Sequence, residues 1–158
     1  MSSRKDRPSG PPGAAERSRR IMALVHTALL ASVGVYAVVL LFLRSEIAPA
    51  AAEPPAGTRL FLVLAALGAA QFACASVVGR ALLRSPRSGA ADRVRLYFLL
   101  RGAAAEAIAL YGFVLGLLGA SASQVAALFV LSVAALVLCA PTRVSWEEAF
   151  RRAQSSSP

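Results

Sequence analysis

The sequence has 158 residues, of which 57% are hydrophobic and only 16% are charged, and its formal net charge is +9. A soluble globular domain is about 45–50% apolar and about 25% charged, so the composition excludes an ordinary soluble domain. The basic residues lie almost entirely between apolar blocks and are not interleaved with aromatic residues, which excludes a groove that binds nucleic acid.

Residues 1–20 form a basic tail that we expect to be disordered. Residues 1–16 are rich in Pro, Gly and Ser and hold too few apolar side chains to form a core. The cations of the tail are Arg4, Lys5, Arg7, Arg17, Arg19 and Arg20. They all precede the first long apolar segment, so they bear on how the chain is oriented in a membrane.

Four apolar segments follow the tail, at 21–43, 60–83, 96–119 and 122–140. A helix needs roughly 20 residues to cross about 30 Å of hydrocarbon, and each segment is close to that length. None shows the alternation of barrel strands, and in lipid the other way to satisfy the backbone is a helix. The sequence therefore predicts an all-α polytopic membrane protein, a bundle of four transmembrane helices.

Lys and Arg are distributed unevenly between the connections. The second connection and its flanks carry Arg80, Arg84, Arg87, Arg93, Arg95 and Arg101, and residues 141–158 carry Arg143, Arg151 and Arg152. The first connection has only Arg44 and Arg59, offset by Glu46 and Glu53. Because cationic loops stay in the cytoplasm, both termini are predicted to be cytoplasmic. The richness in Ala, Arg and Gly is typical of high-GC bacteria, so the expected location is the bacterial inner membrane.

One alternative concerns the N-terminal span. Ala48-Pro49-Ala50 matches the small-residue pattern of a signal-peptidase site. The apolar stretch before it is longer than the usual signal-peptide core of about 7–15 residues, which favours a retained span. Cleavage would leave three spans and place the new N-terminus outside, and this alternative stays open.

The C-terminal segment, 141–158, is expected to hold a short helix. Ser145 and Glu148 have the spacing of a capping box, which would start the helix at Ser145. Trp146 and Phe150 stand four residues apart and are followed by two arginines. That pattern predicts an interfacial helix on the cytoplasmic side, with Trp146 as an anchor at the headgroups.

The two cysteines, Cys74 and Cys139, both fall inside predicted spans. They are too few to frame a disulfide scaffold, and no His or Cys stands at metal-ligand spacing from them. We expect both to be small packing residues, with neither a metal nor a cofactor bound by the chain.

Two basic side chains lie about one and a half turns inside predicted spans, His26 in the first and Arg101 in the third. Both are near the end that we expect to face the cytoplasm. The simpler interpretation is that Arg101 extends to the headgroups and that a neutral His26 bonds a neighbouring helix.

Glu106 lies near the middle of the third span, where a charge costs at least a few kcal/mol. Arg101 is five residues away and therefore about 140° around the helix, so the two side chains point to different sides. Gln71 lies at matching depth in the second span and is the expected partner, because its amide can bond either protonation state of the acid. The pair is either a functional site or a structural bond between helices.

The third span also carries a stripe of small residues spaced three and four apart. Its members are Gly102, Ala105, Ala109, Gly112, Gly116 and Gly119. A comparable face of the second span holds Gly68, Gln71, Ala75 and Gly79. Small residues let helix backbones approach closely, so these faces either close a monomeric bundle or build a homo-oligomer.

The run from Ala105 to Leu118 resembles the ion-binding helix of the c subunit, or proteolipid, of F/V-type ATP synthases, and the resemblance covers roughly residues 60–118. It implies that Glu106 binds the transported ion, that Tyr111 orients it and that Gln71 contributes from the preceding helix. Ala107 stands where sodium-binding members place Ser or Thr, which implies a proton as the ligand. The basic connection with Arg84-Ser85-Pro86 is similar to the family's cytoplasmic loop.

Two functions follow as hypotheses. The first is a non-enzymatic integral membrane protein, structural or accessory to a membrane complex. The alternative is a proton-binding, proteolipid-like protein that uses Glu106 as a reversible carboxylate. The expected partners are the lipid bilayer and either a second copy or a membrane complex, with no nucleic acid.

Overall fold

The computed structural model describes residues 14–46, 55–85 and 89–155. These residues form five helices and no strand: α1 Ala14–Glu46, α2 Pro55–Leu83, α3 Ala90–Leu117, α4 Ala122–Leu138 and α5 Arg143–Ser155. The all-helical prediction is confirmed for this part of the chain. The Ala48–Ala50 sequence and residues 1–13 of the tail lie outside the described residues.

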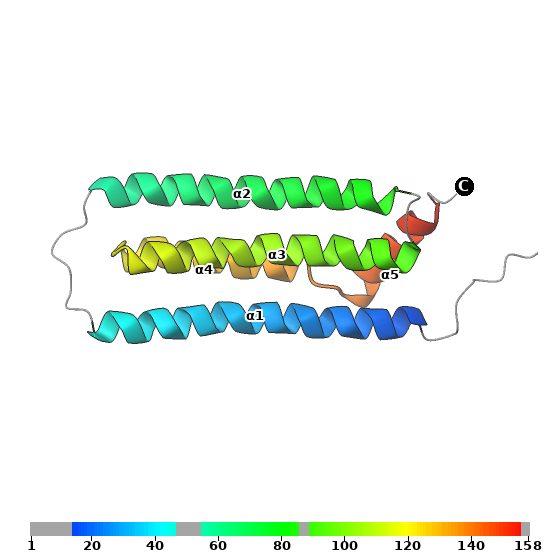
Figure 1. Ribbon diagram of the computed structural model, residues 1–158, viewed down its shortest axis with the longest axis horizontal. Coiled ribbons are helices and arrows are strands. Elements are labelled where there is room, and N and C mark those ends of the chain that lie inside the picture. The colour runs from blue at the N-terminus through cyan, green and yellow to red at the C-terminus, as the bar shows by residue number, and fades with distance from the viewer. Residues whose placement is uncertain (1–13, 47–54, 86–88, 156–158) are drawn as a thin grey trace, which may run out of the picture.

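Helix α3 is the centre of the bundle. It packs against α1 and α2, which lie on opposite sides of it, and against α4 and α5. Figure 1 shows α5 at the end of the bundle where α1 and α3 begin and α2 ends. We call this end, which carries Arg17, Arg80, Arg93 and Arg95, the basic end.

Three helices, α1, α2 and α3, are long and apolar enough to cross a membrane. Helix α4 has 17 residues and therefore rises only about 26 Å, which is short of about 30 Å of hydrocarbon. Together with α5 it passes the same test as a broken span, bent by 63°. The described residues therefore provide three candidate spans, or four if the bent pair counts as one.

Helix α1 begins at Ala14 rather than at Ile21, so residues 14–20 are helical where the sequence predicted a disordered tail. The Glu16 carboxylate bonds Arg19 at 2.8 Å and Arg20 at 3.2 Å, pairs that lie on one side of a helix. Ser18 is buried and accepts a hydrogen bond from Arg95 of α3 at 2.5 Å. These contacts extend the helix beyond its apolar part.

The small residues expected to let helices approach are used inside the chain. A Cβ on Gly79 would lie 2.8 Å from the Tyr97 ring, and one on Gly116 would overlap the Leu40 side chain. Gly68, Gly102 and Gly112 make similar approaches to Ile108, Leu29 and Leu128. Both predicted small-residue faces therefore help to close this bundle.

Gly119 is an exception to the predicted stripe. It follows the end of α3 with φ of +82°, a conformation that L side chains rarely adopt. The amide of Gly119 bonds the Gly116 carbonyl at 3.2 Å, and the amide of Ala120 bonds the Leu115 carbonyl at 3.2 Å. This pattern is a Schellman motif, so Gly119 ends the helix and does not pack against a neighbour.

Two arginines bind the carboxyl ends of helices. The guanidinium of Arg93 is buried and donates to the carbonyls of Leu83 at 3.1 Å and Ser85 at 2.6 Å, where α2 ends. Arg44, near the end of α1, donates to the carbonyl of Ala120 just after α3. A cation at these positions offsets the partial negative charge of carbonyls that have no helical partner.

Helix α5 exists, but its start differs from the predicted capping box. The Thr142 hydroxyl accepts from the Ser145 amide at 3.2 Å, so the helix begins at Arg143. Glu148, the other residue of the predicted capping box, bonds Arg152 instead. Trp146 is only 4% exposed and stacks on Phe98 of α3, with ring centroids 5.5 Å apart. The indole is therefore buried between helices, where the sequence predicted an anchor at the headgroups.

Candidate functional site

The carboxylate of Glu106 faces α1. Its Oε1 accepts hydrogen bonds from the Ser32 hydroxyl at 2.5 Å and from the Tyr36 hydroxyl at 3.1 Å. Ser32 and Tyr36 are four residues apart, so both lie on the side of α1 that meets α3. The group is partly buried between these two helices.

Gln71 is not the partner of Glu106. The hydrogen bond that its Oε1 accepts comes from the Tyr111 hydroxyl, at 2.7 Å. Tyr111 lies five residues after Glu106 and therefore about 140° around α3, so the side that presents Tyr111 to α2 turns Glu106 toward α1. Of the three residues expected to form one proton site, Gln71 and Tyr111 thus bond each other on one side of α3, whereas Glu106 lies on another side.

The neighbouring contacts explain why Ser32 meets Glu106. Helices α1 and α3 run in the same direction (Figure 1), and their contacts advance together from Leu29 against Gly102 to Leu40 against Gly116. Ser32 is near the middle of the first apolar segment, as Glu106 is near the middle of the third. Residues of equal depth on two parallel helices are therefore brought side by side.

A third polar contact joins α3 to α4. The buried Ser132 hydroxyl donates to the Ala105 carbonyl at 2.7 Å, one residue before Glu106. Nothing in the sequence distinguishes Ser32, Tyr36 and Ser132 from the other hydroxyl residues of the apolar segments. Equal depth was a usable signal for Ser32, but it applied to Gln71 as well.

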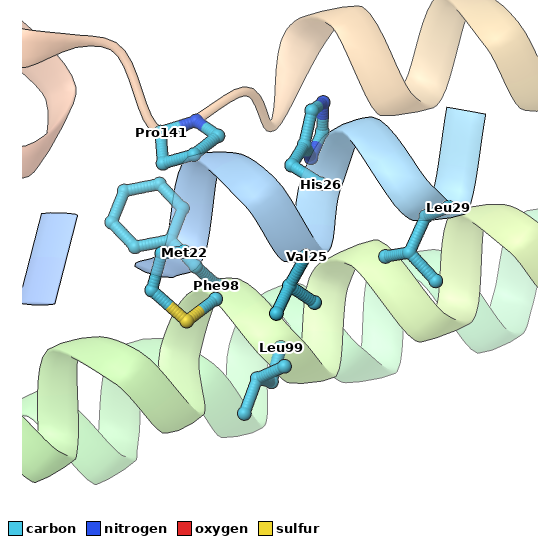
Figure 2. A pocket seen from close by; sticks show the side chains of 7 residues that line it. All are labelled: Met22, Val25, His26, Leu29, Phe98, Leu99 and Pro141. Atoms are coloured by element: carbon cyan, nitrogen blue, oxygen red, sulfur yellow. The ribbon is translucent and has the colours of Figure 1, made fainter. Parts of the chain in front are cut away.

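His26 lies on α1 near the end of α4. Figure 2 shows its imidazole directed toward the chain that leaves α4, beside Pro141 and away from Leu99. The ring interacts with the backbone of Leu136, and its Nε2 is buried without a hydrogen-bond partner among the described residues. The expected contact with a neighbouring helix is therefore present.

Arg101 does not extend freely toward the end of the bundle. Its Nη1 donates to the Tyr97 hydroxyl at 2.8 Å, and its guanidinium lies 5.4 Å from the centroid of that ring and 5.5 Å from the centroid of the Phe72 ring. A guanidinium held over two aromatic faces is stabilised by cation–π attraction. Arg101 is thus fixed between α2 and α3, on a different side of α3 from Glu106.

The cysteines occupy different environments. Cys139 is 2% exposed at the end of α4, whereas Cys74 lies on the exposed side of α2, and neither forms a disulfide. The packing role predicted for both therefore fits Cys139 and not Cys74. Among residues 14–46, 55–85 and 89–155, no three His, Cys, Asp or Glu side chains could hold a metal ion.

Chemically, the centre of the bundle is a carboxyl group among hydroxyls. Serine and tyrosine hydroxyls can donate to a carboxylate or accept from a carboxylic acid. The Ser32 hydroxyl also lies 2.7 Å from the Leu29 carbonyl of its own helix, so its proton has a second acceptor. Comparison of the chain with family models, with curated proteins and with solved structures finds no match.

Proposed function

We propose that this chain is a non-enzymatic, multi-pass protein of the bacterial inner membrane, with both termini in the cytoplasm and a structural or accessory role in a membrane complex. The observation that carries the proposal is the use of the polar side chains. Glu106, Tyr111 and Ser132 each bond a group on a neighbouring helix. Bonds of this kind hold membrane helices together, at roughly 0.6 kcal/mol each on average.

The outer surface supports the location in a bilayer. Large apolar side chains on the outer faces of α1, α2 and α4 are exposed, among them Leu24 at 72%, Val77 at 66% and Val130 at 68%. Such continuous apolar faces are typical of contact with lipid or with other membrane helices. The concentration of arginine at the basic end supports the cytoplasmic side for that end.

A second function, reversible proton binding by Glu106, is favoured by one observation. Ser32 can donate either to Glu106 or to the Leu29 carbonyl. If Glu106 binds a proton, the carboxylic acid can donate to the Ser32 oxygen while Ser32 donates to Leu29. The site then keeps its hydrogen bonds in both protonation states. In this proposal the site residues are Glu106, Ser32 and Tyr36, without Gln71 and Tyr111.

The two functions are separated by carbodiimide labelling. Dicyclohexylcarbodiimide enters apolar sites and reacts with protonated carboxyl groups. Membranes that contain the full chain are labelled over a pH series, and the adduct is located by mass spectrometry of peptides. Labelling of Glu106 that falls as the pH rises supports the proton-binding function. A constant extent of labelling across the series, including none, contradicts it.

The structural function is tested with Glu106→Gln, which keeps an oxygen acceptor for Ser32 and removes the titratable group. If the role is structural, this variant accumulates in the membrane and supports its complex as the wild type does. Glu106→Leu, which removes the acceptor, weakens both. A Glu106→Gln variant that folds normally and loses the cellular function would contradict the structural role.

A further inference from the structure

A cleft of about 200 Å³ opens at the basic end, between α3, α5 and the end of α4. Its polar lining comes from Tyr97, Arg101, Ser145, Glu148 and Arg152. Its apolar lining includes Leu83, Phe98 and Leu138. The cleft lies away from Glu106 and has no part in the function proposed above.

The cleft exists because α4 stops early. Pro141 has no amide proton and cannot continue the helical bonds, so α4 ends at Leu138. The chain then turns by 63° into α5, which covers the beginning of α3 around Phe98. The part of α3 that carries Arg101 lies between the two covering helices, and the space beside it is not filled.

Arg101 gives this space a fixed positive charge. Its guanidinium is oriented by the Tyr97 hydroxyl and by the two aromatic rings described above. Among the described residues it forms no ion pair, and its buried Nε has no hydrogen-bond partner. The guanidinium is thus held in place at the cleft, and no carboxylate among the described residues is paired with it.

Helix α5 brings polar groups to the other wall. Arg152 bonds Glu148, so these two charges offset each other, and the guanidinium of Arg101 leaves the lining with a net charge of about +1. The Ser145 hydroxyl adds a further polar group; it now donates to the Ala140 carbonyl at 3.0 Å. That carbonyl also accepts from the Thr142 amide at 2.8 Å, so the serine can turn to another acceptor.

We propose that this cleft binds a phosphate group, either in the headgroup of an anionic phospholipid or as a free phosphate. The planar guanidinium of Arg101 matches two phosphate oxygens, and Arg152 and Ser145 are placed to donate from the opposite wall. Basic pockets between helices at the end of a bundle have the position and the charge that anionic headgroups require. The apolar lining, with Leu83 and Leu138, suits the glycerol and the first methylenes of a lipid.

The single tryptophan of the chain reports on this cleft. Trp146 stacks on Phe98, which lines it, so an occupant changes the surroundings of the only indole. The full chain in neutral detergent is titrated with dioctanoyl phosphatidic acid, with dioctanoyl phosphatidylcholine and with inorganic phosphate, and Trp146 emission is followed. We expect a saturable change with phosphatidic acid and affinity for phosphatidylcholine lower by about tenfold, since its headgroup carries no net charge.

The titrations with phosphatidic acid and with inorganic phosphate distinguish the two sources of phosphate. Saturation by phosphatidic acid alone assigns the cleft to a lipid headgroup, and competition by inorganic phosphate in the same range assigns it to a soluble phosphate. If neither phosphatidic acid nor inorganic phosphate gives a saturable change, the proposal is overturned, because neither source of phosphate then binds in the cleft.

Neighbouring arginines of α5 provide a matched control. Arg152→Gln and Arg151→Gln remove the same charge one residue apart, but only Arg152 lines the cleft. We expect Arg101→Gln and Arg152→Gln each to weaken binding about tenfold or more, and Arg151→Gln to change it less than about twofold. Equal losses from Arg151→Gln and Arg152→Gln would mean unspecific attraction to a basic surface and would overturn the site.

A folding control accompanies these variants. Arg101→Lys keeps the charge but cannot present two parallel donors to a phosphate. Thermal unfolding of each variant is measured without the probe. If Arg101→Lys unfolds at the wild-type temperature but binds phosphatidic acid more weakly, the result supports recognition by the guanidinium. Wild-type affinity in Arg101→Lys contradicts recognition by the guanidinium. If the Arg101 variants do not fold, the affinity of Arg152→Lys for phosphatidic acid is compared with that of the wild type instead.

Discussion

The hydroxyl of Ser32 lies 2.5 Å from Oε1 of Glu106 and joins α1 to α3 across 74 positions of sequence. Together with Tyr36 it gives the acidic group of the third apolar segment two donors from the first. The contact places the polar centre of the protein between two parallel helices and not within the α2–α3 hairpin.

The first prediction concerns this contact. Ser32→Ala should destabilise the protein, and a double-mutant cycle with Glu106→Leu should give a coupling energy of about 0.6 kcal/mol, up to roughly 1.7. The measurement is unfolding in mixed micelles with increasing SDS. Thr27→Ala is the control, because Thr27 bonds the Ala23 carbonyl of its own helix. Equal coupling of Glu106 to both positions would contradict the contact.

The second prediction concerns the approach of α1 to α3. Gly116→Ala should destabilise by about 1–3 kcal/mol, because the added methyl group would meet three atoms of the Leu40 side chain. Gly34→Ala on α1 meets nothing within 4 Å and should be neutral or stabilising by up to about 1 kcal/mol. Both values come from the same unfolding assay. A Gly116→Ala variant as stable as Gly34→Ala would mean that the two helices are not this close.

The third prediction concerns Arg93. Substitution by Met keeps much of the aliphatic volume and removes the donors to the Leu83 and Ser85 carbonyls, so the loss should be about 1.5–3 kcal/mol. Arg80→Met provides the comparison, since Arg80 is exposed on α2 and should change stability by less than about 0.5 kcal/mol. Thermal unfolding measures both. Similar small effects at the two positions would argue that Arg93 serves only to orient the chain.

The fourth prediction concerns Trp146. Because the indole is 4% exposed and stacked on Phe98, iodide in solution should quench its fluorescence weakly. Phe98→Ala should increase the quenching constant, while Phe61→Ala, in the other apolar cluster, should not. Strong quenching of the wild type would instead support the anchor at the headgroups that the sequence predicted.

The helices could be predicted from sequence because hydropathy over about 20 residues is a local property. The partner of Glu106 could not, because it depends on which helix lies against which side of α3. The sequence does indicate that Glu106 and Tyr111 have different partners. They are about 140° apart around α3, so they face different neighbouring helices. Matching depth in a hairpin favours Gln71 as the partner of Glu106, but depth does not determine which side of α3 meets α2.

The helix ends were harder to predict for a different reason. The capping pattern predicts a start of α5 at Ser145. The helix instead begins after Thr142, whose hydroxyl accepts from the Ser145 amide, because Pro141 ends the preceding helix just before it. Gly119 continued the spacing of the small-residue stripe and yet ends α3 with a positive φ. Local spacing alone does not distinguish a glycine that packs from one that turns the chain.

The central position of α3 has a consequence for how the protein assembles. Helices α1 and α2 precede it in the chain and make little contact with each other, since each packs mainly on α3. When the first two helices have entered a bilayer, they therefore have few contacts to make with each other. At that stage Gln71 has no Tyr111 to bond and Ser32 has no Glu106. We expect tertiary assembly during synthesis to wait for the third helix and then to proceed at once on both of its sides.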